Sequence, residues 1–110
     1  MENTPFVMNI KDPKNYDENG KRIKNLGYAA RVGGSLANLL KEHESVQMVA
    51  LGAGPVNNAV KALHYAQRIL KQEDLDLAAT KFEIIEVSLS STRGADRQGK
   101  ATAITVNLIR

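Results

Sequence analysis

The side chains in this sequence best suited to chemistry are basic residues that fall into three groups. The groups are Lys21, Arg22 and Lys24, then Lys61 and Arg68, and finally Arg93, Arg97 and Lys100. Taken singly, such groups are usually solvated surface features. Taken together they suit a phosphate backbone, because lysine and arginine neutralise phosphates and release counterions. We therefore expect backbone contacts to DNA or RNA, with no residue that we can assign to reading bases.

Catalytic chemistry has little support in the sequence. His43 and His64 are 21 residues apart, and neither has metal-ligand spacing around it. Ser88, Ser90 and Ser91 lie in an expected strand and hairpin instead of a nucleophile elbow. We expect a protein that is not an enzyme, with no catalytic residue, no metal and no cofactor.

The segment Gly52–Pro55, with the sequence GAGP, joins an expected strand to an expected helix. Gly52 and Gly54 permit close backbone approach, and the free N–H groups of a helix N-terminus can hold an anion. The third glycine of the dinucleotide motif and the Lys-Ser/Thr pair of a P-loop are both missing. A tight, closely packed turn is the simpler interpretation, and anion binding is the alternative.

The composition is that of one small domain. The chain has 110 residues, of which 43% are hydrophobic and 25% charged, and it has no cysteine. The missing cysteines exclude disulfide scaffolds, thiolate metal sites and cysteine nucleophiles. Two phenylalanines, three tyrosines and no tryptophan argue against a base-stacking platform as the main recognition device.

Charge and hydropathy bear on partners and location. The net charge of +3 permits an anionic partner, and six of the fifteen Lys and Arg residues fall in 21–24 and 93–100. No apolar stretch approaches the roughly 18 residues of a membrane span, and the first residues lack a signal-peptide core. We expect a cytoplasmic protein, with nucleoid association left open and no membrane partner.

The first half of the chain predicts a strand, a long loop and a helix. Residues 6–10 are an opening or edge strand, and residues 11–27 are polar and rich in turn residues. So long a loop is usually functional or disordered. Helical spacing begins at Tyr28, with Asn25 as a candidate cap. Gly33 and Gly34 fit this helix if it lies close to a sheet or a second helix.

The middle of the chain predicts a strand at 45–51 and a helix from Pro55 to about Gln72. Proline suits the first helical position because its φ is fixed and it lacks an N–H. One side of the helix is apolar, and the opposite side carries Asn57, Lys61, His64, Arg68 and Gln72.

The last part of the chain predicts a β-hairpin. Residues 75–80 are a connection, 81–89 a strand, 90–100 a basic hairpin tip and 101–109 the returning strand. Phe82 and Ile84 face one way, and Ile85, Val87 and Leu89 face the other. Either a bulge intervenes or both faces are covered, one of them by another subunit.

The order of elements is therefore β-α-β-α-β-β, without an internal repeat. We expect one α/β domain of the α+β type, in which a single mixed sheet is backed by two helices.

Two stretches, GGSLANLL and VQMVALGAGPVNNAVKALHYAQRIL, resemble the stage V sporulation protein S family. The matching residues are Gly52, Ala53, Gly54, Val56, Asn57, Ala59, Val60, Lys61 and Ala62. The final DRQGKATAITVNLIR is similar to the closing hairpin strand of the wider Alba superfamily. The resemblance covers about 26–72 well and 81–110 more loosely, and 11–25 resembles an insertion.

This resemblance implies one Alba-like domain over residues 1–110 that binds nucleic acid as a homodimer or a higher homo-oligomer. It places contacts after the first strand, near the start of the second helix and on the hairpin. Residue by residue these are Lys21, Arg22 and Lys24, then Asn57 and Lys61, and Arg93, Arg97 and Lys100. The archaeal chromatin pattern carries cations around the central turn, where this chain has Gly54 and Asn58. That departure argues against tight duplex packaging and favours the sporulation branch.

Two other functions remain open. The chain could be a regulatory module that assembles with itself or with a protein partner and uses charge for solubility. The two-faced strand 81–89 motivates that reading. The last hypothesis, after nucleic-acid binding and the regulatory module, is a domain that binds a small molecule or a nucleotide through the GAG turn.

Overall fold

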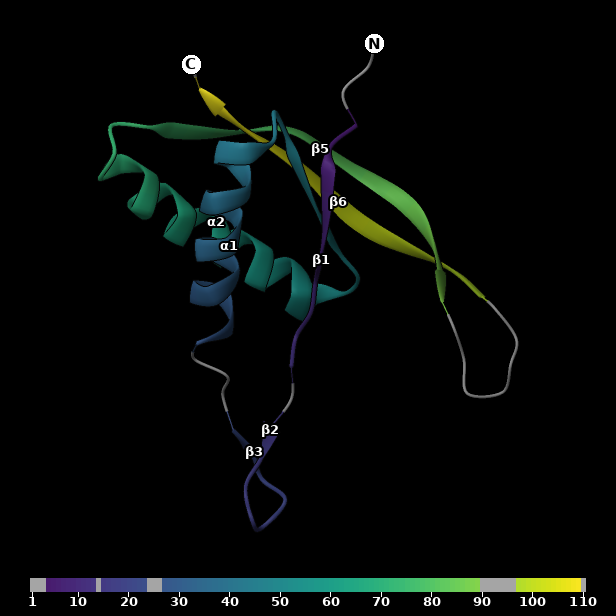
Figure 1. Cartoon of the computed structure of the whole chain (residues 1–110). Coiled ribbons are helices and arrows are strands. Elements are labelled where there is room, and N and C mark those ends of the chain that lie inside the picture. The colour runs from purple at the N-terminus through teal and green to yellow at the C-terminus, as the bar shows by residue number, and fades with distance from the viewer. Residues whose placement is uncertain (1–3, 14, 24–26, 90–96, 110) are drawn as a thin grey trace.

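The computed structural model describes residues 4–13, 15–23, 27–89 and 97–109 (Figure 1). Its elements are β1 Phe6–Ile10, β2 Asn15–Tyr16, β3 Arg22–Ile23, α1 Tyr28–Glu42, β4 Val46–Ala50, α2 Ala53–Lys71, β5 Asp76–Leu89 and β6 Arg97–Ile109. The four long strands form one sheet in the order β1-β4-β6-β5, in which β1 is parallel to β4 and β6 is antiparallel to both its neighbours. The expected mixed sheet with two helices is confirmed, and so is the β-α-β-α-β-β order around the small β2–β3 hairpin.

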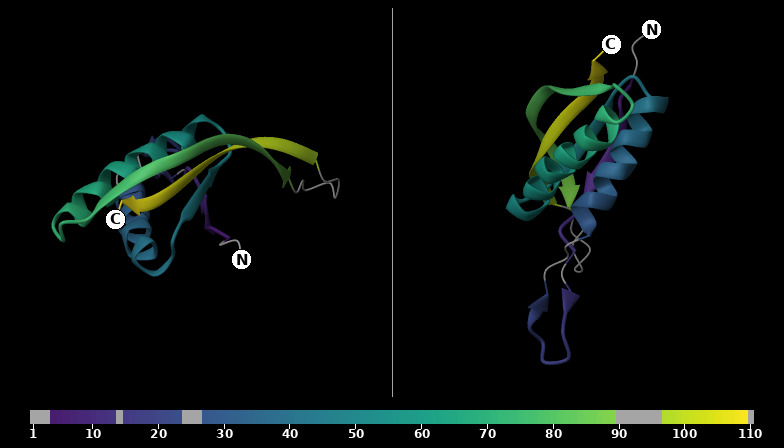
Figure 2. Two further views of the ribbon diagram at one scale, coloured as in Figure 1. Left: turned by 90° about the horizontal axis from the view of Figure 1, so that it is seen from above. Right: turned by 90° about the vertical axis from the view of Figure 1, so that its left-hand side faces the viewer.

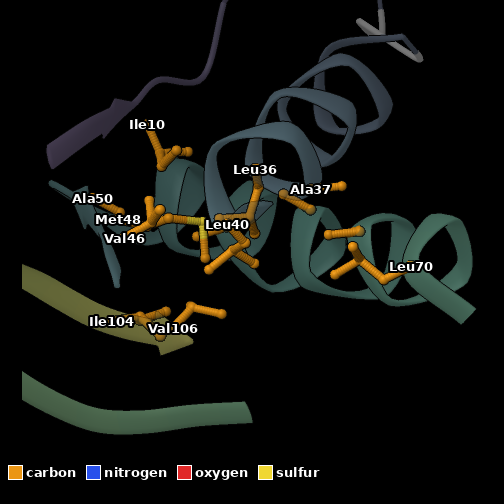
Figure 3. Close-up of a cluster of buried hydrophobic side chains, with 13 residues drawn as sticks. Ile10, Leu36, Ala37, Leu40, Val46, Met48, Ala50, Leu70, Ile104 and Val106 are labelled. Atoms are coloured by element: carbon orange, nitrogen blue, oxygen red, sulfur yellow. The ribbon is translucent and has the colours of Figure 1, made fainter. Parts of the chain in front are cut away.

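The core lies between the two helices and one face of the sheet (Figures 2 and 3). In β4 every second residue is fully buried, because alternate side chains of a strand point to the same face. The cluster is Ile10, Leu36, Ala37, Leu40, Val46, Met48, Ala50, Ala59, Ala62, Ala66, Leu70, Ile104 and Val106. Alanines line the buried side of α2, so this helix packs closely and turns its polar side outward.

The two helices are in close contact at Gly33 of α1. A Cβ atom at this position would lie 2.5 Å from Cβ of Tyr65 and 2.9 Å from the backbone oxygen of Ala62. At Gly34 an added Cβ would meet nothing within 4 Å. The expected close packing against a second helix is therefore confirmed for Gly33 and has no counterpart at Gly34.

α1 begins at Tyr28, as the sequence predicts, but its cap and the start of α2 differ from the expectation. The N-cap of α1 is Gly27, and Asn25 lies outside the described residues. α2 begins at Ala53, which makes Pro55 its third residue. Its N-cap is Gly52 with a φ of 94°, in the region that favours glycine because a Cβ would clash with the backbone. The chain therefore enters α2 two residues earlier than the proline suggests.

The segment expected to be a plain loop at 11–27 contains the β2–β3 hairpin. Asn15 pairs with Ile23 and Tyr16 with Arg22. The turn between them is stabilised by Asp17. Its Oδ1 accepts hydrogen bonds from the backbone N–H groups of Asn19 and Lys21, each with a donor–acceptor distance of 2.9 Å. Such local bonds from side chain to backbone stabilise a turn that hydrophobic periodicity cannot reveal.

The hairpin strands are longer than expected. β5 starts at Asp76, so most of the segment 75–80, expected to be a connection, is strand. β6 starts at Arg97, so the strand takes up part of the expected 90–100 tip, and residues 90–96 lie outside the described residues. Cross-strand pairs such as Leu77 with Leu108 draw the first residues of β5 into the sheet.

A bulge lies between Ala79 and Lys81, before the segment 81–89 in which the apolar residues change faces. It shifts the register so that Ala79 lies opposite Val106 and Phe82 opposite Ile104. Directly paired residues share a face, so Phe82 lies on the helix-bearing face of the sheet. Beyond the bulge the strand alternates regularly, and both of its faces carry apolar residues.

Candidate nucleic-acid interface

The outer side of α2 carries a line of exposed polar residues, which we call the α2 basic stripe. Its members are Asn57, Lys61, His64, Arg68 and Lys71, all of them exposed. Steps of three and four residues place them on one side of the helix. The opposite side is buried in the core, so the stripe faces solvent.

No acidic residue occurs anywhere in α2, from Ala53 to Lys71. The three cations of the stripe therefore have no carboxylate on their own helix to neutralise them. Arg68 and Lys71 lie in the last turn, where cations also stabilise the helix dipole. Lys71 is absent from the sequence candidates, although the three-residue step after Arg68 continues the same periodicity. The candidates Asn57 and Lys61 both lie in this stripe.

The β2–β3 hairpin, residues 15–23, extends away from the sheet and helices, and we call it the N-terminal arm (Figures 1 and 2). Lys21 is exposed on this arm, just before β3. Arg22 lies in β3 directly opposite Tyr16. Lys24 lies outside the described residues. The arm therefore carries two of the three cations expected in this segment.

The base of the arm is fastened to both helices. The backbone N–H of Lys11 donates to the hydroxyl of Tyr28 in α1 over 2.7 Å. The backbone oxygen of the same residue accepts a hydrogen bond of 2.8 Å from the side-chain amide of Asn58 in α2. These two bonds fix the chain where it leaves the sheet.

Gly54 has a packing role at the same place. A Cβ atom added there would lie 2.1 Å from Oδ2 of Asp12 and 2.7 Å from its Cγ. The Asp12 carboxylate thus occupies the space beside the first turn of α2, where negative charge is favoured. Close packing therefore accounts for Gly54, the second glycine of the GAG turn. The space beside this glycine, which a bound nucleotide would need, is filled by Asp12.

The third candidate region is the part of β5 and β6 that continues past the helices as a two-stranded ribbon (Figure 1). Lys100 is exposed in β6 and lies directly opposite Glu86. An acid in that position offsets its charge. Arg97 lies at the start of β6, opposite Leu89. Arg93 lies outside the described residues.

The fold keeps these three regions apart within one chain. The N-terminal arm and the end of the ribbon project from the body in different directions, with α2 on the body itself (Figure 1). The described candidate cations therefore lie on three separate surfaces, of which the α2 basic stripe is the one without acids.

The ribbon also exposes apolar side chains. Phe82 is 64% exposed and Ile84 is 66% exposed, and we call this pair the ribbon apolar patch. Both lie on the helix-bearing face, since they pair with Ile104 and Thr102. Val60 on α2 is a further exposed apolar residue. Large apolar side chains exposed side by side usually mark an interaction surface.

Within the described residues, no group of three or more His, Cys, Asp or Glu side chains is arranged to hold a metal ion. His64 lies in the α2 basic stripe, whereas His43 follows α1 and its ring lies 4.8 Å from that of Phe6.

No helix in the described part of the chain has the length and apolar character needed to cross a membrane.

Comparison with known protein families supports the resemblance found in the sequence. Residues 23–108 match the model of the Stage V sporulation protein S family. A search of curated proteins gives no significant match. The matched region runs from the end of β3 nearly to the end of β6, so it contains both helices and the whole sheet except β1 and the last residue of β6. Most of the N-terminal arm lies outside it.

Proposed function

The chain belongs to the stage V sporulation protein S family, and from this membership together with its basic surfaces we propose that it is a sporulation-related protein that binds nucleic acid. It acts as a dimer and holds DNA or RNA through the phosphate backbone, largely without sequence specificity. The observation that carries this proposal is the α2 basic stripe, a line of exposed cations on a helix without acids.

The dimensions of the stripe suit a phosphate backbone. Lys61 and Lys71 are separated by ten residues of α2, which corresponds to about 15 Å at about 1.5 Å per residue. Phosphates on one strand of B-DNA advance about 3.4 Å each along the axis, so the stripe spans about four of them. Contacts from lysine and arginine side chains to phosphates hold the nucleic acid but do not distinguish one base sequence from another.

The two projecting hairpins extend this surface. Lys21 and Arg22 are on the N-terminal arm, and Arg97 and Lys100 are on the ribbon. A two-stranded ribbon is narrow enough to enter a major groove. We include Lys24 and Arg93 in the proposed interface on the sequence resemblance alone.

The ribbon apolar patch supports the dimer. Phe82 and Ile84 are each about two-thirds exposed, on a part of the helix-bearing face that the chain's own helices do not cover. A second copy that covers the patch would bury both side chains. Full burial of each would stabilise the dimer by about 1.5–3 kcal/mol. Two copies would also double the number of basic stripes, which raises affinity through multivalency.

One alternative function has an observation in its favour. The ribbon apolar patch and the Glu86–Lys100 pairing suit a regulatory module that assembles with itself or a protein partner and does not bind nucleic acid. Fluorescence-anisotropy titrations with labelled duplex DNA, single-stranded DNA and RNA separate the two functions. Binding that weakens with salt supports the proposed function. Self-assembly in light scattering without binding to any of the three favours the alternative.

A further inference from the structure

Tyr16 is an aromatic side chain held out in solvent on the N-terminal arm. It is 60% exposed, and it lies in β2 of a hairpin that has only two residues in each strand. A two-stranded hairpin has no core of its own, and an aromatic ring there gains little from burial. The position therefore keeps a large flat ring accessible at the cost of exposing it to water.

The arm presents this ring in a fixed setting. The backbone N–H of Asp17, the residue after Tyr16, donates to the carbonyl of Lys21 over 2.9 Å. The turn is further closed by the two bonds to Asp17 Oδ1 and by Gly20, whose φ is 77°. Before the arm, the backbone of Lys11 is hydrogen-bonded to side chains of both helices.

The charges on the arm balance each other. Lys21 and Arg22 are matched by Asp17 and Glu18. The arm therefore has no net charge that would attract a phosphate backbone from a distance, and the exposed ring distinguishes it from the α2 basic stripe. An exposed aromatic ring with a cation on the same hairpin suits an unpaired nucleotide, because the ring can stack on the base while the cation contacts the phosphate.

We propose that Tyr16 stacks on an unpaired base, so that the N-terminal arm is a single-strand contact that adds to the backbone binding of α2. Lys21 neutralises the adjoining phosphate. The bases of a duplex are stacked on each other and offer no free face, whereas a single strand or an RNA loop does. This inference rests on the proposed function and names the class of nucleic acid that the chain prefers.

The test compares Tyr16→Ala with Tyr16→Phe on single-stranded and duplex oligonucleotides of equal length, at one salt concentration. Tyr16→Ala should lower the affinity for the single strand by roughly 5- to 150-fold, the range found for the loss of one stacked base. Tyr16→Phe keeps the ring and should keep the affinity. The matched control is Phe6→Ala, which removes another exposed aromatic ring, in β1 away from the arm, and should change neither affinity.

A second measurement uses the absence of tryptophan from the chain. In Tyr16→Trp the new ring is the only indole, and its fluorescence should be quenched when single-stranded DNA binds. Unchanged single-strand affinity in Tyr16→Ala would overturn the inference, as would an equal loss on the duplex or an unquenched tryptophan. If the unmodified chain binds no nucleic acid, the proposed function fails as well. If it binds and Tyr16→Ala binds equally well, only the stacking contact is refuted.

Discussion

The side-chain amide of Asn58 in α2 donates a hydrogen bond to the backbone carbonyl of Lys11, 2.8 Å away and 47 residues earlier in the chain. The same nitrogen lies 3.5 Å from Oδ1 of Asp12, whose carboxylate packs against Gly54. The base of the N-terminal arm is thus fastened to the first turns of the helix that carries the basic stripe. Two segments that are distant in the sequence are joined by this bond.

Removing this contact should loosen the arm without unfolding the domain. We expect Asn58→Ala to cost about 1 kcal/mol, because one hydrogen bond is lost and the Lys11 carbonyl stays accessible to water. Limited proteolysis should then cut the chain between residues 11 and 24 faster. The neighbouring Asn57→Ala is the matched control, because Asn57 is exposed on the same helix. Equal proteolysis rates for the two variants would contradict the account of the arm.

The two adjacent glycines of α1 should respond in opposite directions to alanine. Gly33→Ala places a Cβ against Tyr65 and Ala62, so the helices must separate, at a cost of about 1–3 kcal/mol. Gly34→Ala meets open space and should stabilise α1 by up to about 1 kcal/mol, since alanine favours the helix. Thermal unfolding measures both, and each kcal/mol moves the Tm by about 4–8 °C. Changes of the same sign would show that the helices do not meet at Gly33.

Replacing the ribbon apolar patch should abolish self-association. The double variant Phe82→Ser and Ile84→Ser removes two side chains that we propose to be buried in the dimer. Light scattering should then report a mass near 12 kDa, that of one chain, where the unmodified protein gives twice that value. Ile109→Ser is the control, because Ile109 is 54% exposed in β6, opposite Asp76 at the start of β5. A dimer that survives the double substitution must use another surface.

Charge removal on α2 should weaken nucleic-acid binding uniformly. Each of Lys61→Gln and Arg68→Gln deletes one phosphate contact, so the slope of log affinity against log salt should become shallower by about 1 for each. The affinity should fall alike for oligonucleotides of different sequence. Lys81→Gln is the control, since Lys81 is also an exposed cation, on β5, and forms an ion pair with Glu83 at a distance of 3.5 Å. An equal effect of Lys81→Gln would mean that net charge matters and the stripe does not.

The sequence predicts the helices and the sheet well because their signals are local and repeated. The apolar spacing of α2 identifies its buried side, and hence its basic stripe. The paired glycines of α1 indicate a close helix contact, although only the structure shows that Gly33 makes it. The start of β5 is missed because its first residues join the sheet through pairs with β6, which lies far along the chain.

The parts that could not be predicted depend on contacts between distant residues or on single side chains. The N-terminal arm exists because Asp17 closes its turn, and periodicity carries no trace of that bond. The carboxylate of Asp12 packs beside Gly54, which lies 42 residues later in the chain. Because the sequence does not show this contact, a glycine needed for packing resembles part of an anion site. Of the candidate cations, Lys61 falls in the stripe, Lys100 lies opposite an acid, and Lys24 and Arg93 lie outside the described residues.

The proposed function requires that α2 holds nucleic acid by charge. Its most direct test is an anisotropy titration of labelled DNA and RNA across a series of salt concentrations, with the unmodified chain and with the double variant Lys61→Glu and Arg68→Glu. We predict that the unmodified chain binds with an affinity that falls as salt rises, and that the double variant binds at least tenfold more weakly to every oligonucleotide at low salt. Equal binding by the two proteins, or no binding by the unmodified chain at low salt, would contradict the claim.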